Sequence, residues 1–154
     1  MRQLIIARKD LHMSPGKLAA QCCHASFAFL SDQLRSVNPE LIDEAEEFRC
    51  GEKYYQIPVV VEKDVWRNWI NSIFTKTICE AKNRNQLMKA VLVAEELGLV
   101  EGEDFFLIKD ACLTELEPEE VDENGVGRVL TCIGFRPLPD EIAHQISRKF
   151  QLYK

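Results

Sequence analysis

"MSPGKLAAQCCHASFAF", from Met13 to Phe29, is the stretch that decides how this sequence folds. Ser14 followed by Pro15 predicts a helix start, because serine caps helix N-termini and proline suits the first helical position. The helix is expected to continue to about Arg35. Its many alanines have small side chains, which permit a close approach to a sheet.

One stripe of this predicted helix is polar. At about 3.6 residues per turn, Lys17, Gln21 and His24 align along one side. A lysine near a helix N-terminus is not explained by helix stability, because cations are disfavoured there. The stripe is therefore either an ordinary solvent-facing surface or a set of hydrogen-bond donors for an anion or a developing oxyanion.

Outward from this helix, the 154 residues predict one domain, residues 1–154. Apolar runs predict strands at 2–8, 74–81, 105–109 and 128–135, and helical spacing predicts helices at 38–48, 64–70, 85–97 and from Pro139 through Phe150. Trp66 and Trp69 are expected in the core. Asn124-Gly125 predicts a hairpin between the last two strands. This order predicts an α/β fold, with a four-stranded mixed sheet flanked by helices on both faces and a helical insert at about residues 36–73.

Composition narrows the class of protein. Hydrophobic residues make up 46% and charged residues 29%, as in ordinary soluble domains, and no apolar run approaches the roughly 20 residues that cross a bilayer. The start, MRQLIIARKD, is unlike a signal peptide, so a cytoplasmic protein with no membrane partner is expected. The six cysteines lack zinc-finger or disulfide-framework spacing, which predicts free thiols.

The net charge of −6 argues, taken alone, against a nucleic-acid partner. The charges are unevenly distributed, however. Segments 1–38, 65–92 and 126–154 are net positive, whereas 39–64, 93–110 and 111–125 are net negative. A basic face on an acidic protein and a plain solvated surface both fit this alternation.

Three motifs, read together, resemble one known family. Arg8 to Ala25 reads R-x-D-L-x-M-S-x-G-K-x-A-A-Q-x-x-H-A, Ile108 to Glu115 reads IKDACLTE, and TCIGF is followed by the PDEI that opens the last helix. They are similar to the type 2 peptidyl-tRNA hydrolase family over most of the chain, except roughly residues 36–73.

This resemblance implies a hydrolase without a metal or other cofactor that cleaves the ester between a peptide and the 3′-terminal ribose of tRNA. It places Lys17, Gln21, His24, Asp110 and Thr114 on the family's proposed catalytic positions. Ester hydrolysis needs an oriented water, a proton acceptor and donors for the oxyanion. Asp110 could orient the water with Thr114 holding its geometry, while Lys17 and Gln21 could donate to the oxyanion, or Lys17 could bind the terminal phosphate.

The expected partner is the acceptor end of a tRNA that carries a peptidyl group. Cations that could surround the Lys17 stripe, and so contact the tRNA, are Arg8, Lys9, Lys76 and Arg136. A homodimer is also compatible with the sequence.

Two other classes of function stay open. Cys112 stands where the family has a glycine, and glycine often serves a positive φ, so the loop could differ. This departure favours a catalytically weak relative that acts as a tRNA-end or protein-binding module. A cysteine hydrolase is the other class, and it would need the fold to bring Cys112 to His24.

Overall fold

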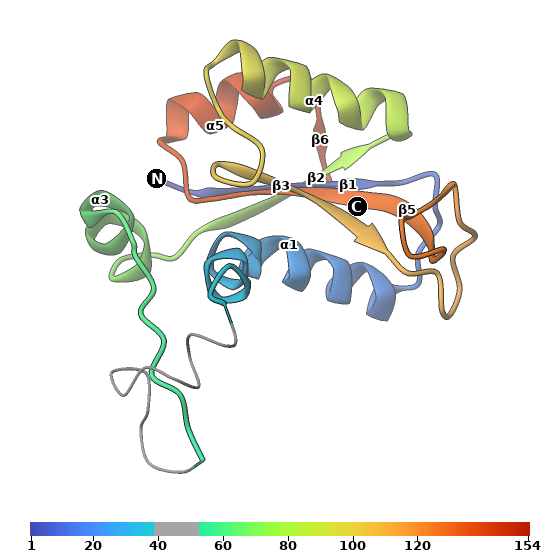
Figure 1. Cartoon of the computed structure of the whole chain (residues 1–154). Helices are drawn as coiled ribbons and strands as arrows, with labels where there is room; N and C mark the ends of the chain where they lie inside the picture. Colours follow the sequence, from blue (N-terminus) through green and yellow to red (C-terminus); the bar gives the residue numbers. More distant parts are fainter. Residues whose placement is uncertain (39–52) are drawn as a thin grey trace.

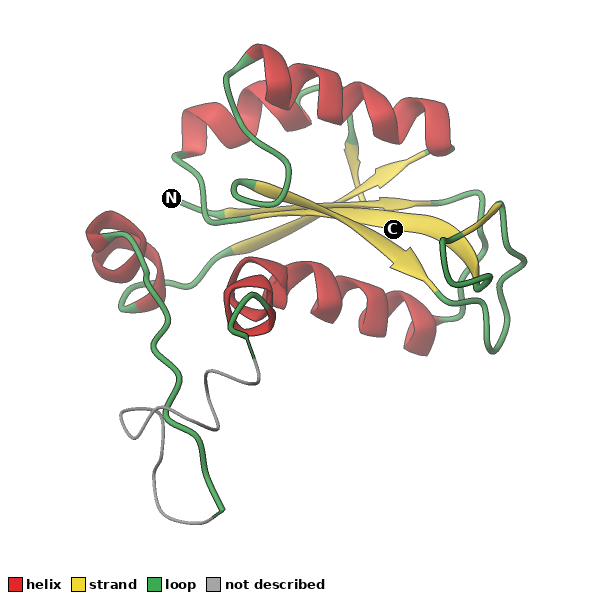
Figure 2. Ribbon diagram, in the orientation of Figure 1, coloured by secondary structure: helices red, strands yellow, loops and turns green. Residues whose placement is uncertain are grey.

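A mixed β-sheet between two layers of helices organises the chain (Figures 1 and 2). The computed structural model describes residues 1–38 and 53–154, so the helix expected at 38–48 falls, after its first residue, outside the described residues. The strands are β1 (Gln3–Arg8), β2 (Lys76–Ala81), β3 (Phe105–Asp110), β4 (Glu120–Val121), β5 (Gly127–Phe135) and β6 (Gln151–Leu152). The helices are α1 (Pro15–Arg35), α3 (Lys63–Val65), which continues as a π-helical segment (Trp66–Ile70), α4 (Arg84–Glu96) and α5 (Asp140–Ser147).

The strand order is β3-β5-β1-β2-β6, and β4 pairs with β5. β1 and β2 run parallel, while β5 is antiparallel to both β1 and β3. The α/β class and the mixed sheet are confirmed, but the prediction of four strands is wrong, because the described part of the chain forms a sheet of six. The two missed strands, β4 and β6, have two residues each, which is too short for a readable alternation. The turn at Asn124-Gly125 joins β4 to β5, and β3 reaches β5 through a longer loop.

The two helical layers create separate cores. Figure 1 shows α4 and α5 on one face of the sheet and α1 on the other. The larger core lies under α4 and α5, where Leu87 and Val91 of α4 meet Leu4 and Ile133 of the sheet. A smaller one lies under α1, where Cys22 and Ala25 meet Ile5, Ala7 and Cys132.

Helix α1 lies unusually close to the sheet. A Cβ atom at Gly134 of β5 would lie 2.2 Å from the carbonyl oxygen of Ala25, so only glycine fits there. Beside this contact, the Ser26 hydroxyl donates to Gln3 Oε1 at 2.8 Å, and Gln3 Nε2 donates to the Ser26 carbonyl at 2.8 Å. The buried glutamine and the glycine together fix the position of α1, and with it the polar stripe of its first turns.

Element boundaries agree closely with the sequence. The Ser14 cap is confirmed, because its hydroxyl accepts from the Lys17 N–H at 3.2 Å. Asn83 caps α4 two residues before the expected start, and Pro139 precedes α5.

Trp69 is buried as predicted, but Trp66 is 54% exposed, so its assignment to the core is wrong. The π-helical segment is only five residues long and turns just one tryptophan inward.

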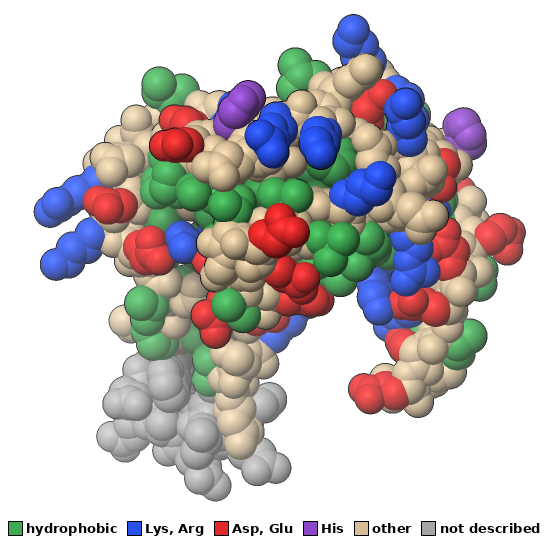
Figure 3. All heavy atoms as spheres, turned by 90° about the horizontal axis from the view of Figure 1, so that it is seen from above, with side chains coloured by type: hydrophobic (Ala, Val, Ile, Leu, Met, Phe, Trp, Pro, Cys, Tyr) green, Lys and Arg blue, Asp and Glu red, His purple; other side chains and the backbone are tan. Residues whose placement is uncertain are grey.

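The face formed by α4 and α5 carries basic side chains among acidic ones (Figure 3). Lys89, Arg148 and Lys149 line a shallow groove between these two helices. Across the part of the chain that the structure describes, no helix has the length and apolar character needed to cross a membrane.

Candidate active site

Four of the five candidate catalytic residues meet at one end of the sheet. Lys17 and Gln21 lie in the first turns of α1, Asp110 is the last residue of β3, and Thr114 lies in the loop that follows. β1 also ends at this end of the sheet, and β5 begins there, because β5 is antiparallel to both β1 and β3.

The Asp110 carboxylate is the centre of this cluster. Its Oδ2 lies 2.7 Å from Lys17 Nζ and accepts a hydrogen bond from Gln21 Nε2 at 2.8 Å. Its Oδ1 accepts from the backbone N–H of Cys112 at 2.9 Å. Lys17 Nζ also lies 3.2 Å from Thr114 Oγ1, to which it donates. The side chains of Lys17 and Asp110 are only 15% and 11% exposed, so little solvent screens the pair.

Burial acts to raise the pKa of Asp110, but the hydrogen bonds from Lys17 and from the Cys112 N–H outweigh it. The pKa of Asp110 therefore lies below its ordinary value. The group is ionised at neutral pH and has a low affinity for protons. Such a carboxylate is better suited to orienting a water molecule as a hydrogen-bond acceptor than to removing its proton outright.

A buried threonine supports this cluster from below. Thr131 of β5 is fully buried, and its Oγ1 lies 2.7 Å from Gln21 Oε1. With the amide oxygen bonded to the hydroxyl, Nε2 faces Asp110. The sequence prediction missed Thr131, although a signal was present: it is the polar residue inside the apolar run VLTCIGF.

Cys112 keeps the backbone conformation that a glycine would adopt. Its φ is +54°, in the left-handed region, and its N–H bonds to Asp110. The replacement of the family's glycine therefore leaves the loop able to serve the site. Burial and the nearby Asp110 charge raise the pKa of the Cys112 thiol, which disfavours a thiolate nucleophile.

His24, the fifth candidate, lies along the cleft rather than in the cluster. The cleft has a volume of about 500 Å³ and runs between α1 and β3, starting at Gln21 and Asp110. Its floor includes Phe27, Ala28 and Ile108. His24 is exposed, and no hydrogen bond or ion pair joins its side chain to another residue that the structure describes.

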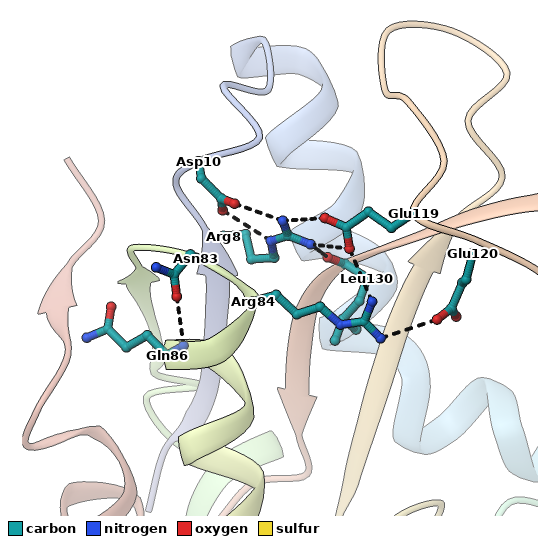
Figure 4. Close-up of polar contacts among 8 residues, drawn as sticks. All are labelled: Arg8, Asp10, Asn83, Arg84, Gln86, Glu119, Glu120 and Leu130. Carbon is teal, nitrogen blue, oxygen red and sulfur yellow. Dashed lines mark hydrogen bonds and ion pairs between the residues drawn. The ribbon is translucent and has the colours of Figure 1, made fainter.

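Arg8, expected to contact tRNA, is instead buried, and its guanidinium group is bonded to carboxylates within the protein (Figure 4). All five of its N–H donors are bonded, to the carboxylates of Asp10 and Glu119 and to the Leu130 carbonyl. Glu119 also pairs with Arg84 at the start of α4. Arg8 thus has no donor left for a phosphate, and it anchors the segment that follows the Thr114 loop.

The other three cations are not gathered around Lys17. Lys9 follows β1 at the catalytic end, where it pairs with Glu80 at 2.7 Å and lies 4.8 Å from the centre of the Tyr153 ring. Lys76 pairs in register with Gln3, at the opposite end of the sheet. Arg136 follows β5 at that same opposite end, where it pairs with Asp104.

Within residues 1–38 and 53–154, no group of three or more His, Cys, Asp or Glu side chains is arranged to hold a metal ion. The cysteines of this part, Cys22, Cys23, Cys79, Cys112 and Cys132, are free thiols. Cys50 lies outside the described residues.

An α/β domain whose cleft ends at an ionised carboxylate with lysine and amide donors holds the groups that acyl-ester hydrolysis requires. The family model described as "Peptidyl-tRNA hydrolase PTH2" matches residues 1–153, and the chain belongs to this family. It is 30% identical over 154 residues to a peptidyl-tRNA hydrolase of Methanopyrus kandleri, with 99% of this chain and 98% of that protein covered.

Two further relatives extend the comparison. A peptidyl-tRNA hydrolase of Thermococcus sibiricus is 28% identical over 152 residues, covering 98% of this chain and 96% of that protein. The protein named peptidyl-tRNA hydrolase 2, mitochondrial, of Bos taurus is 26% identical over 152 residues, covering 99% of this chain and 64% of that protein.

Proposed function

We propose that this chain hydrolyses the ester bond of peptidyl-tRNA, releasing the peptide and free tRNA. The observation that carries the proposal is the Asp110 carboxylate, which Lys17 and Gln21 hold at the end of a cleft. Membership of the family supports the same reaction. The alternative, a binding module without turnover, loses its main support because Cys112 keeps the left-handed conformation.

The proposed mechanism uses this chain's own groups. Asp110 accepts a hydrogen bond from a water molecule and directs its oxygen at the ester carbonyl. Of the three N–H donors of Lys17, one bonds to Asp110 and one to Thr114, and no other described residue takes up the third, which can donate to the developing oxyanion. A donor in that role typically accelerates a reaction by about 10²–10³-fold. The water oxygen bonds to the carbonyl carbon, and the bond from that carbon to the ribose oxygen then breaks. The proton that the water loses is taken up by the ribose oxygen.

His24 belongs to the proposal as a group that contacts the substrate along the cleft. Lys9 is the proposed tRNA contact at the catalytic end of the sheet. Lys76 and Arg136 lie at the start of β1, whereas the catalytic cluster lies at its end. The two ends of this strand are about 17 Å apart, at a rise of about 3.3 Å per residue. Lys76 and Arg136 therefore contact tRNA only beyond its terminal nucleotides. Arg8, with its donors bonded inside the protein, supports the site structurally.

We also propose a cytoplasmic location, which the free thiols of the described residues support, because thiols persist in a reducing compartment. A homodimer remains a prediction, and sedimentation equilibrium of the purified chain tests it.

The test of the function is hydrolysis of N-acetyl-aminoacyl-tRNA by the purified chain, with and without a metal chelator. Release of the N-acetyl amino acid should rise in proportion to the protein and should be unaffected by the chelator. Release no faster than spontaneous deacylation, together with tight tRNA binding, would overturn the proposal and favour the binding module. Activity that is lost in chelator and restored by zinc would contradict a metal-free mechanism.

A further inference from the structure

Within the described residues, β3 forms one edge of the sheet, because it pairs with β5 on one side only. Its backbone groups alternate between the two sides. The carbonyl of Asp104, just before β3, accepts from Arg136 N–H on the β5 side. Phe105, the next residue, bonds outward to Val100 and Gly102. The register with β5 shifts between Ile108 and Lys109, but the extra residue, Thr131, belongs to β5, so the alternation along β3 continues. Leu107 and Lys109 therefore direct their N–H and C=O groups to the outer edge.

This outer edge is open beside the cleft. Within the described chain, no hydrogen bond engages the outward backbone groups of Leu107 or Lys109. Both residues line the cleft that ends at Asp110. An unpaired strand edge is a ready template for another extended chain, because its backbone donors and acceptors gain partners when a strand is added.

We propose that this edge binds the peptide part of the substrate as an added β-strand that runs parallel to β3. The inference rests on the proposed function and deepens it. The scissile ester lies at the C-terminus of the peptide, and β3 runs toward Asp110. The peptide must therefore run in the same direction as β3 to deliver its ester to the Asp110 cluster.

The molecule already contains the start of such a parallel neighbour. Glu101 and Phe105 form a parallel bridge on the outer edge, with Phe105 N–H bonded to the Val100 carbonyl and Gly102 N–H bonded to the Phe105 carbonyl. The turn then leaves the edge, so the open part extends from residue 106 to 109. That length accommodates about three or four peptide residues, since strands in register advance by similar distances per residue.

Recognition through backbone groups suits this substrate class. A hydrolase that acts on peptides of many sequences cannot rely on particular side chains, whereas every peptide offers the same N–H and C=O groups. Alternate peptide side chains would face α1 beside Phe27, where the small residues Ala28 and Ser31 leave space in the cleft. The other side chains would point away from α1.

The experiment compares kcat/KM for N-acetyl-aminoacyl-tRNA with kcat/KM for peptidyl-tRNAs of two, three, four and six residues. Each added backbone hydrogen bond should raise kcat/KM about two- to tenfold, and kcat/KM should stop rising at a peptide length of three or four residues. A second series of tetrapeptidyl-tRNAs carries a single N-methyl group at successive peptide bonds. The loss should alternate along the peptide, because in a parallel pairing only every second residue bonds to β3.

Lys109→Pro provides a test on the protein side, since an edge strand tolerates proline and the change removes the outward N–H. The ratio of kcat/KM for tetrapeptidyl-tRNA to that for N-acetyl-aminoacyl-tRNA should fall toward one. Lys109→Gln keeps the N–H and should keep the ratio. If the proline variant does not fold, the N-methyl series decides alone.

The outcomes separate the two proposals. Hydrolysis of N-acetyl-aminoacyl-tRNA with no dependence on peptide length, or with N-methyl losses that do not alternate, would overturn the added strand and leave the proposed function standing. No hydrolysis of any of these substrates would overturn the proposed function itself.

Discussion

At the scale of single residues, the site depends on how donors are shared around one carboxylate. Asp110 takes three of them, from Lys17, Gln21 and the Cys112 backbone. Lys17 would be unfavourable near the start of a helix, but its position is explained by the anion that it meets across the cleft. Helical spacing predicted Lys17 and Gln21 on one stripe, and the family resemblance added Asp110, but only the fold shows that the three share hydrogen bonds.

Thr131→Val tests whether the buried hydroxyl orients Gln21. The change keeps the shape but leaves Gln21 Oε1 without its partner, so we expect the free energy of unfolding to fall by about 1–3 kcal/mol. We also expect kcat to fall several-fold with KM for peptidyl-tRNA unchanged, while Thr131→Ser restores kcat. A variant that loses stability but keeps the wild-type kcat would show that Thr131 serves only the packing.

The pH dependence follows from the lowered pKa of Asp110. An aspartate ordinarily titrates near pH 3.9, so a carboxylate whose pKa lies below that value stays ionised throughout the range from pH 5 to 7. Its stabilising contribution is present above the unfolded-state pKa and is lost as the pH falls through the lower folded-state value.

We therefore expect no loss of kcat/KM between pH 7 and 5 from Asp110. In Lys17→Gln, kcat/KM should begin to fall at a higher pH than in the wild type. The variant lacks the ammonium group that lowers the pKa of Asp110, so the effect of burial, which raises that pKa, is less opposed. Rate profiles recorded with circular dichroism as a control for folding test this prediction. An acid limb at the same pH in both proteins would contradict the assignment to Asp110.

At the scale of elements, α1 is the part that the sequence describes best. Ser14-Pro15 located its start and the alanines indicated a close approach to the sheet. The residue on the other side of that contact, Gly134, could not be identified from its own neighbourhood. A glycine within a strand has several explanations, and only the register of β5 against α1 selects one of them.

Gly134→Ala should be strongly destabilising, because its Cβ would meet the backbone of Ala25, which cannot move without displacing α1. Overpacking of this kind typically costs about 1–3 kcal/mol, occasionally more. Activity should fall as well, since α1 carries Lys17 and Gln21. The matched control is Gly16→Ala in the same helix, where a Cβ meets nothing within 4 Å, so stability should be unchanged or higher. Thermal unfolding of both variants decides, and equal melting temperatures would contradict the close approach.

Other features needed the three-dimensional structure. Arg8 is basic and precedes the predicted helix, so its sequence suggests a surface cation, but its partners Asp10 and Glu119 lie 2 and 111 residues away. Lys76 and Arg136 flank the predicted strands, yet their distance from the site depends on strand direction, which local sequence does not encode. The strands β4 and β6 are too short to be read from a pattern.

At the scale of the whole molecule, a protein with a net charge of −6 must hold a polyanion. Few phosphate contacts are expected, so the salt dependence of tRNA affinity should be shallow. Each contacted phosphate adds a log–log slope of about 0.7 for single strands. Lys9→Ala should reduce the slope by roughly that amount, whereas Lys149→Ala, on the α4–α5 face, should leave it unchanged. The opposite pattern would place the tRNA on the α4–α5 face.

The proposed mechanism requires that the Lys17–Asp110 cluster perform the hydrolysis. Its most direct test is the single-turnover rate of N-acetyl-aminoacyl-tRNA hydrolysis by the wild type, Asp110→Asn and Lys17→Ala, with the folding of each variant verified by thermal unfolding. We predict that each substitution lowers the rate at least tenfold, or about 1.4 kcal/mol of activation free energy, because each removes a group that contacts the reacting atoms. Wild-type rates in both folded variants would contradict the account.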